Sequence, residues 1–115
     1  MKTVGKVSSV ACAFLTAAAS LVFVAKAASA PPQKSAEDIY SHNCAICHGK
    51  DGAGKTTQGK RTKAKDVRDT VKVMSEDEMI KVVQKGKGAS MDAYGDELKP
   101  DQIKAVVEYY RGLAK

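Results

Sequence analysis

The chain has 115 residues, with 19 Lys and Arg against 13 Asp and Glu, and a formal net charge of +6. Residues 31–115 contain neither Trp nor Phe, so tyrosines are their only aromatic side chains. A segment of this size forms one small domain, which is marginal unless a disulfide, a metal or a cofactor supplements its core. These bounds exclude a core built on large aromatic side chains and favour a domain that buries a cofactor.

Residues 1–30 have the composition of a secretory signal peptide. Lys2 and Lys6 form a positive start, residues 7–25 are apolar, and small residues lie at 27–30. Cleavage near residues 27–30 would leave a single domain at 31–115 outside the cytoplasm, in the periplasm. The apolar stretch is also long enough for an uncleaved membrane anchor, and that alternative stays open.

Helix signals follow in chain order. Ser35 suits a helix N-cap, with Glu37 and Asp38 in the first turn, and the helix is expected to run through Cys44 and end near Gly49. Residues 50–65 show no helical or strand period; three glycines and six basic side chains predict a mobile loop there.

Two further helices are predicted in the second half of the chain. Ser75 and Glu78 form a capping-box pattern before an apolar stripe, and Gly86 suits the end of that helix. Residues 88–95 are irregular. Pro100 fits the first turn of a last helix, whose apolar residues recur at three- and four-residue steps up to Leu113. No strand alternation is present, so an all-α domain is expected.

The most informative motif of the chain is Cys44-Ala45-Ile46-Cys47-His48. A Cys-x-x-Cys-His run is typical of c-type haem attachment. Two thiols one helical turn apart can each add to a haem vinyl group, and the adjacent imidazole then reaches the iron from the same side. One such run predicts one covalently attached haem c. His48 should be neutral, with its other ring N–H donated to a backbone carbonyl.

Three other interpretations of these residues stay open. A disulfide-exchange site also uses Cys-x-x-Cys, but usually at a helix start within an α/β fold. Zinc could bind Cys44, Cys47, His42 and His48, although the adjacency of Cys47 and His48 leaves little freedom to close a tetrahedron. The third interpretation is a structural disulfide between the two cysteines.

A second iron ligand has four candidates within residues 31–115, namely Met74, Met79, Met91 and His42. Met74 and Met79 flank the capping box at apolar positions, where Met usually fills the core. His42 shares the predicted helix of His48 and cannot easily cross to the opposite haem face. Met91 lies in the irregular segment, and we expect it to approach from that side. Filled axial positions leave no site for bond-making chemistry, which favours an electron carrier over an enzyme.

Positive charge is concentrated in residues 50–87, which hold 11 basic and 6 acidic side chains. Such a segment can steer an acidic redox partner and raise the encounter rate, or it can be a solvated loop. Aromatic side chains are not interleaved with these lysines, so nucleic acid is not an expected partner.

The chain resembles a small class I cytochrome c of the bacterial, periplasmic kind. Besides the Cys-x-x-Cys-His motif, the resemblance rests on Gly49, Gly52 and Gly54, which match the family's CHG-x-x-G-x-G run, and on residues 86–91, which look like its distal-ligand loop and end at Met91. It covers residues 35–113. The family fold implies that the first and last helices cross, with Ala36 and Tyr40 against Ile103, Tyr109 and Tyr110.

Two departures from the family pattern bear on the iron ligands. The family commonly has Pro directly after the ligand Met, where this chain has Asp92. It also often has a loop Pro whose carbonyl accepts the N–H of the proximal His, but no Pro lies between Pro32 and Pro100 here. A carbonyl of residues 58–65 is expected to serve instead.

The sequence therefore predicts a monohaem c-type cytochrome that carries single electrons between redox partners outside the cytoplasm. Cys44 and Cys47 would anchor the haem, while His48 and Met91 would ligate its iron. The partners are expected to have acidic docking surfaces, and membrane contact is expected only if residues 1–30 stay uncleaved. The alternative is a haem-based ligand binder or peroxidase-like enzyme with a labile sixth ligand.

Overall fold

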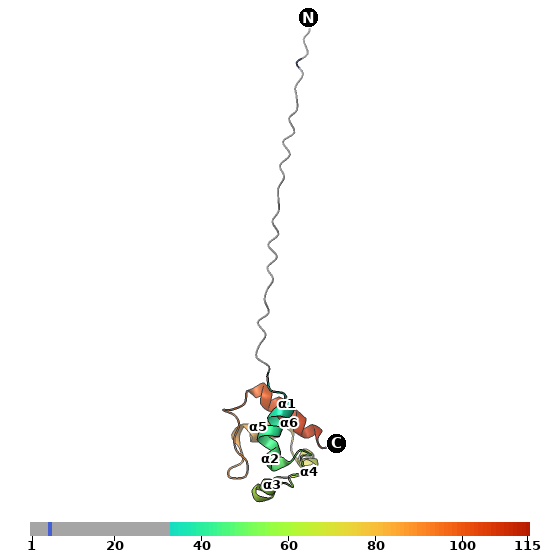
Figure 1. The fold of residues 1–115 in the computed structure, drawn as a ribbon, viewed down its shortest axis with the longest axis vertical. Helices are drawn as coiled ribbons and strands as arrows, with labels where there is room; N and C mark the ends of the chain where they lie inside the picture. Colours follow the sequence, from blue (N-terminus) through green and yellow to red (C-terminus); the bar gives the residue numbers. More distant parts are fainter. Residues whose placement is uncertain (1–4, 6–32) are drawn as a thin grey trace. The chain divides into compact units, whose positions relative to one another are not determined.

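The computed structural model describes residue 5 and residues 33–115, and the fold lies in the latter (Figure 1). Its helical segments are α1 (Ala36–Ile39), η1 (Tyr40–Cys44), α2 (Ala45–His48), α3 (Thr57–Thr62), α4 (Val67–Val73), α5 (Glu76–Lys85) and α6 (Pro100–Gly112). Within these residues there is no β-strand, only an isolated bridge between Lys87 and Ala89. The predicted all-α architecture is confirmed.

The segments α1, η1 and α2 form one helical stretch that carries the chain into the Cys-x-x-Cys-His motif. Ser35 and Asp38 form a capping box, since the Ser35 hydroxyl accepts from the Asp38 N–H at 3.1 Å and the Asp38 carboxylate accepts from the Ser35 N–H at 3.2 Å. In η1 the backbone widens to a π-helical turn, which the sequence did not predict. The stretch ends at Gly49, whose φ of +79° a residue with a Cβ rarely adopts. Single π-helical turns such as η1 are frequent at functional sites.

The prediction of a loop at residues 50–65 is wrong in part, because α3 lies within this segment. The Thr56 hydroxyl accepts from the Gly59 N–H at 2.8 Å and donates to the carbonyls of Ile46 at 2.7 Å and Cys47 at 3.0 Å. One hydroxyl therefore begins α3 and satisfies carbonyls in the last turn of α2. A helix of this length is too short to show an apolar period. The unpredicted α4 begins in the same way, with the Asp66 side chain accepting from the Arg68 N–H.

The two helices predicted for the second half of the chain are confirmed. Helix α5 begins with the capping box of Ser75 and Glu78, and it ends at Gly86, where φ is +72°. Helix α6 begins at Pro100, in the first turn as predicted. Residues between them form turns without a helix or a strand, as expected for an irregular segment.

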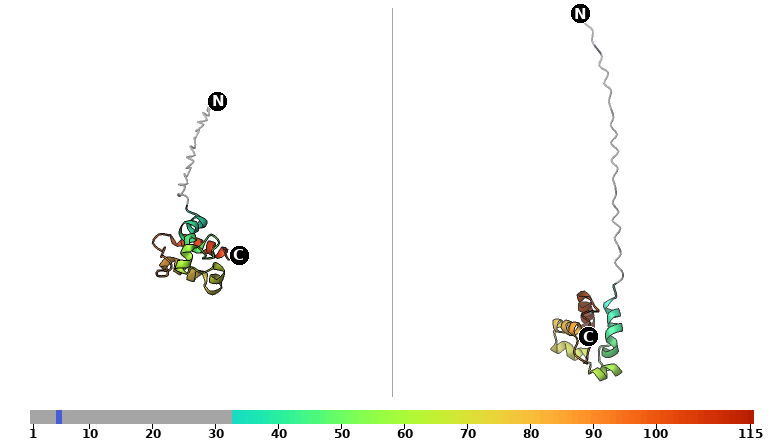
Figure 2. Two further views of the ribbon diagram at one scale, coloured as in Figure 1. Left: turned by 60° about the horizontal axis from the view of Figure 1, so that its bottom comes forward. Right: turned by 90° about the vertical axis from the view of Figure 1, so that its left-hand side faces the viewer.

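The core lies where the first helical stretch packs against α6 (Figure 2). Ile39, Tyr40 and Val106 are buried together there. The Tyr40 ring lies 5.2 Å from the ring of Tyr109 and 6.1 Å from that of Tyr110. This confirms the predicted contact between the N- and C-terminal helices, with tyrosines meeting across it.

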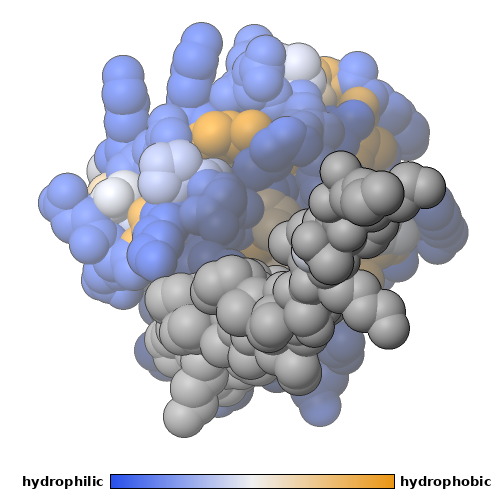
Figure 3. Space-filling view, turned by 90° about the horizontal axis from the view of Figure 1, so that it is seen from above, coloured by the Kyte–Doolittle hydropathy of each residue, from blue (hydrophilic) through white to orange (hydrophobic). Residues whose placement is uncertain are grey.

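The described residues present a mainly polar surface on the face drawn in Figure 3. On the face drawn in Figure 3, hydrophilic residues cover most of the coloured surface and apolar residues form small separate patches. Ile46 and Val73 are the large hydrophobic side chains that the described residues expose, at 66% and 79%. No helix in this part of the chain has the length and apolarity to cross a membrane. The predicted signal peptide lies, apart from Gly5, outside the described residues.

Gly59 provides a test of how α3 packs on the Cys-x-x-Cys-His motif. A Cβ at this position would lie 2.2 Å from the carbonyl oxygen of Cys47 and 2.5 Å from that of Gly54. We expect Gly59→Ala to lower the free energy of unfolding by about 3 kcal/mol, because α3 would have to move away. Denaturant unfolding of the purified protein measures the change.

Gly112→Ala is the matched control, since no atom outside its chain neighbours and the backbone of its own helix lies within 4 Å of the added Cβ. It should change the free energy of unfolding by no more than about 0.5 kcal/mol. Equal stabilities of the two variants would contradict the packing of α3 on the motif.

Candidate functional site

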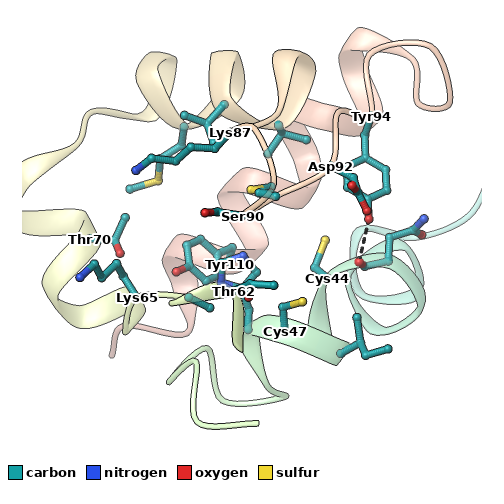
Figure 4. Close-up of a pocket in the computed structure, with 18 of the residues that line it drawn as sticks. Cys44, Cys47, Thr62, Lys65, Thr70, Lys87, Ser90, Asp92, Tyr94 and Tyr110 are labelled. Carbon is teal, nitrogen blue, oxygen red and sulfur yellow. Dashed lines mark hydrogen bonds between the residues drawn. The ribbon is translucent and has the colours of Figure 1, made fainter. Parts of the chain in front are cut away.

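A cavity of about 440 Å³ opens beside the Cys-x-x-Cys-His motif. This volume lies within the range of about 300–1,000 Å³ that is usual for small-molecule and cofactor sites. In Figure 4 the sulfurs of Cys44 and Cys47 point into the cavity from the helix that carries them, and Lys87, Ser90 and Asp92 lie across from them. His48 and Met91 line the same cavity. The four predicted site residues are therefore brought together.

The two cysteines are free thiols and are partly buried. Cys44 ends the π-helical turn, and Cys47 lies in α2. Burial raises the pKa of Cys44 to about 11, and the neighbouring Cys47 adds to this shift. Disulfide-exchange sites instead depend on a thiolate with a lowered pKa, so the environment of Cys44 disfavours that alternative.

His48 is the last residue of α2 and faces the Tyr110 ring edge-on, with ring centroids 5.1 Å apart. Burial lowers its pKa, so the imidazole is neutral at pH 7. Its Nδ1 atom is buried and has no hydrogen-bond partner among the described residues. Buried polar atoms are normally satisfied, and a neutral imidazole with a free ring nitrogen is suited to bind a metal.

The His48 Nδ1 atom forms no hydrogen bond with a carbonyl of residues 58–65, so the partner expected there for the His48 ring is not confirmed. The Gly59 carbonyl accepts from the N–H groups of Lys63 and Ala64, the latter at 2.8 Å. The Gln58 carbonyl accepts from the Thr62 hydroxyl at 3.0 Å. Because this segment forms α3 rather than a loop, these carbonyls serve the helix itself.

His42 does not line the cavity into which the two cysteines point. It is exposed, and its Nδ1 lies 2.8 Å from the Asp38 carbonyl oxygen. Across residues 33–115, no three or more His, Cys, Asp and Glu side chains gather in a group that could hold a metal ion. The alternative of a zinc site with two cysteines and two histidines is therefore not formed.

All three methionines of the domain line the cavity, which the sequence did not indicate for Met74 and Met79. Met79 is buried, and its sulfur lies 3.8 Å from Nη1 of Arg111. Met74 is partly buried at the end of α4. Met91 is partly buried in the irregular segment, where its carbonyl accepts from the Lys87 N–H at 2.8 Å.

Sequence analysis also missed several polar residues of the cavity. Thr70 lines it from α4 and Tyr94 from the irregular segment, and the exposed lysines Lys63, Lys65 and Lys87 line its rim. Apart from Lys63 and Lys65, which share the segment between α3 and α4, these residues come from separate elements, so no local pattern could have grouped them. The concentration of basic residues at 50–87 was the one available signal, and it did not single out these three lysines.

A family model described as cytochrome C oxidase, cbb3-type, subunit III matches residues 31–109. The chain belongs to this family, among the class I c-type cytochromes. The match includes the Cys-x-x-Cys-His motif, most of the residues that line the cavity, and most of α6. It confirms the family that the sequence motifs predicted.

Individual relatives agree with this assignment. Cytochrome c6 of Thermosynechococcus vestitus is 36% identical over 93 residues, which are 81% of this chain and 80% of the relative. The cbb3-type cytochrome c oxidase subunit FixP of Azorhizobium caulinodans is 32% identical over 85 residues; these are 72% of this chain but span only 28% of FixP. The solved c-type cytochrome KustC0563 superposes with a TM-score of 0.66 at 27% identity, covering 71% of this chain and all of that one. The fold is thus the predicted class I cytochrome c fold.

Family membership identifies the cofactor as haem c, attached covalently through Cys44 and Cys47. The residues present fit this group: two thiols point into a cavity of suitable volume, beside a partly buried imidazole whose buried Nδ1 is unsatisfied. The protein is a c-type cytochrome and an electron carrier rather than an enzyme, as predicted. The bound haem supplies an iron that cycles between the ferric and ferrous states. The cavity residues hold it and limit its contact with water.

Proposed function

We propose that this cytochrome carries single electrons between redox proteins outside the cytoplasm, with its haem iron held between His48 and Met91. One observation carries the proposal. A single cavity is lined by both cysteines and His48 from one helical stretch and by Met91 from the segment that follows α5. A planar cofactor anchored at the cysteines would then have a protein ligand available for each face.

His48 suits the proximal position because it directly follows Cys47 in α2, so its backbone is held close to the thioether that Cys47 would form. Its burial keeps the imidazole neutral, so a lone pair is free to bind iron. The Tyr110 ring against it restricts rotation of the imidazole. The position and the protonation state of His48 therefore both favour coordination.

Met91 suits the distal position better than the other two methionines of the cavity. Met79 is 5% exposed within the core, and its sulfur already contacts the Arg111 guanidinium. Met74 follows α4 as its C-cap residue. Met91 lies in a turn segment without helix or strand, which can adjust to a ligand distance. A thioether ligand from Met91 would favour ferrous iron and raise the reduction potential relative to a second nitrogen ligand.

Removing the Met91 thioether tests this coordination. In holoprotein with Met91→Ala we expect loss of the weak far-red ferric absorption band of sulfur ligation, a lower reduction potential, and carbon monoxide binding by the ferrous protein. Met74→Leu and Met79→Leu are controls of similar volume and should keep the band. The assignment fails if the band persists in Met91→Ala, or if it disappears only in one of the controls. Carbon monoxide binding by the native ferrous protein would favour the ligand-binding alternative.

The positive charge at the rim of the cavity supports the prediction that the redox partner has an acidic docking surface. Lys63, Lys65 and Lys87 are exposed at the rim, and none forms a salt bridge with another described residue. By contrast, Lys72 pairs with Asp69 at 3.2 Å. The exposed Ile46 side chain lines the same rim and offers an apolar contact. Uncompensated positive charge beside a redox cofactor steers an anionic partner toward the shortest electron path.

Replacing Lys63, Lys65 and Lys87 with Gln tests the steering. With ferricyanide as an anionic one-electron oxidant, the triple variant should react severalfold more slowly than wild type at low salt, with the difference shrinking as salt screens the charges. A second triple variant, with Gln at Lys34, Lys99 and Lys115, loses the same charge away from the cavity. Stopped-flow rates that fall equally in both variants would contradict a docking role for the rim lysines.

We further propose that residues 1–30 are a signal peptide and that residues 31–115 are the cytochrome domain, located in the periplasm. The composition of residues 1–30 supports this assignment. The N-terminus of holoprotein purified from the periplasmic fraction should lie between residues 28 and 31, as measured by intact mass. Haem-bearing protein that keeps Met1 and is found in the membrane fraction would instead establish the anchored alternative.

A further inference from the structure

Residues 86–95, here called the Met91 loop, form few bonds within themselves. The Lys87 N–H donates to the Met91 carbonyl at 2.8 Å, and the Ser90 N–H donates to the Lys87 carbonyl at 3.1 Å. A Cβ at Gly88 would have no atom within 4 Å apart from its chain neighbours, and most side chains of the loop are exposed. The turn that presents Met91 is therefore not braced from outside along most of its length.

Tyr94 anchors the end of the Met91 loop to both sides of the cavity. Its backbone N–H donates at 2.9 Å to the carbonyl of Val83, in the last turn of α5. Its hydroxyl donates at 3.1 Å to the backbone carbonyl of Asn43 (Figure 4). Asn43 lies in the π-helical turn, directly before Cys44. Tyr94 thus joins the loop to the helical stretch that carries the haem thioethers.

The hydrogen bond of the Tyr94 hydroxyl has no equivalent among the described residues. Among the hydrogen bonds between described residues, only that of Tyr94 with Asn43 connects the Met91 loop to residues 33–49. The donor lies three residues after Met91, and the acceptor lies one residue before Cys44. The two walls of the cavity are therefore held together by a bond close to both.

We propose that Tyr94 is a positioning residue whose hydroxyl latches the Met91 loop to the haem-bearing helical stretch and so keeps Met91 on the iron. The inference rests on the proposed coordination by His48 and Met91. Loss of the hydroxyl removes one hydrogen bond from the closed state only. The fraction of molecules with the loop open should then rise roughly two- to tenfold, the range expected for one net hydrogen bond.

Tyr94→Phe in the holoprotein tests the latch, because it removes the hydroxyl and keeps the ring. An external ligand must wait for Met91 to leave, so its binding rate reports the open fraction. Cyanide binding to the ferric protein should be roughly two- to tenfold faster in the variant, and hydrogen exchange of residues 86–93 should accelerate to a similar extent. The far-red band should remain, because Met91 still occupies the iron in most molecules.

Tyr109→Phe is the matched control. Tyr109 packs against Tyr40 outside the cavity, and its hydroxyl forms no hydrogen bond with another described residue. Tyr109→Phe should leave the rate of cyanide binding and the hydrogen exchange of residues 86–93 unchanged. Rates in Tyr94→Phe equal to those of wild type would overturn the latch, and so would an equal acceleration in both variants, which would reflect general loosening.

The wild-type spectrum separates failure of the latch from failure of the coordination. A wild-type ferric protein without the far-red band would contradict coordination by Met91, whatever the variants do. Hydrogen exchange then tests the latch independently of the iron: faster exchange of residues 86–93 in Tyr94→Phe supports it, and unchanged exchange overturns it. The denaturation midpoints of both Phe variants should be measured alongside, so that each rate is compared between folded proteins.

Discussion

The contact of Tyr40 with α6 and with Gly49 is the interaction on which the rest of the site depends. Its ring is 2% exposed between Tyr109 and Tyr110, and its hydroxyl donates to the Gly49 carbonyl at 2.7 Å. Burial raises the pKa of Tyr40, so the hydroxyl stays protonated and remains a donor. One side chain therefore joins the first and last helices and also holds the backbone directly after His48, where the motif must be placed accurately.

The haem that occupies this cavity in the holoprotein would explain how so small a domain is stabilised. Few large side chains are available, and the buried residues Tyr40, Met79, Val106 and Val107 line the cavity rather than filling it. A covalently held haem supplies apolar surface that the side chains lack, so cofactor attachment and folding stability are coupled in this protein. The thioethers at Cys44 and Cys47 also remove the translational freedom of the cofactor. Tyr94 and Thr56 then hold adjoining segments against the same helical stretch by single hydroxyl groups.

Charge divides the molecule into regions with different roles. Ion pairs such as Arg68 with Asp66 at 2.8 Å and Lys72 with Asp69 at 3.2 Å are exposed and local, and pairs of this kind contribute little to stability. The lysines at the cavity rim lack such partners among the described residues, so their field extends into solvent beside the haem site. An asymmetric field of this kind influences association rates more than the fold.

The sequence by itself determined the elements whose signals are local. The Cys-x-x-Cys-His spacing identified the cofactor. The N-cap signal at Ser35 and the capping box at Ser75 marked helix starts, and Pro100 marked the last helix. Only the tertiary structure decided the rest. The π-helical turn, α3, the unsatisfied nitrogen of His48 and the bond from Tyr94 to Asn43 depend on contacts between residues far apart in the chain or on backbone geometry without a periodic signal. Local hydrogen bonding is encoded by neighbouring residue types, whereas the pairing of distant segments is set by how the whole chain packs around the cavity.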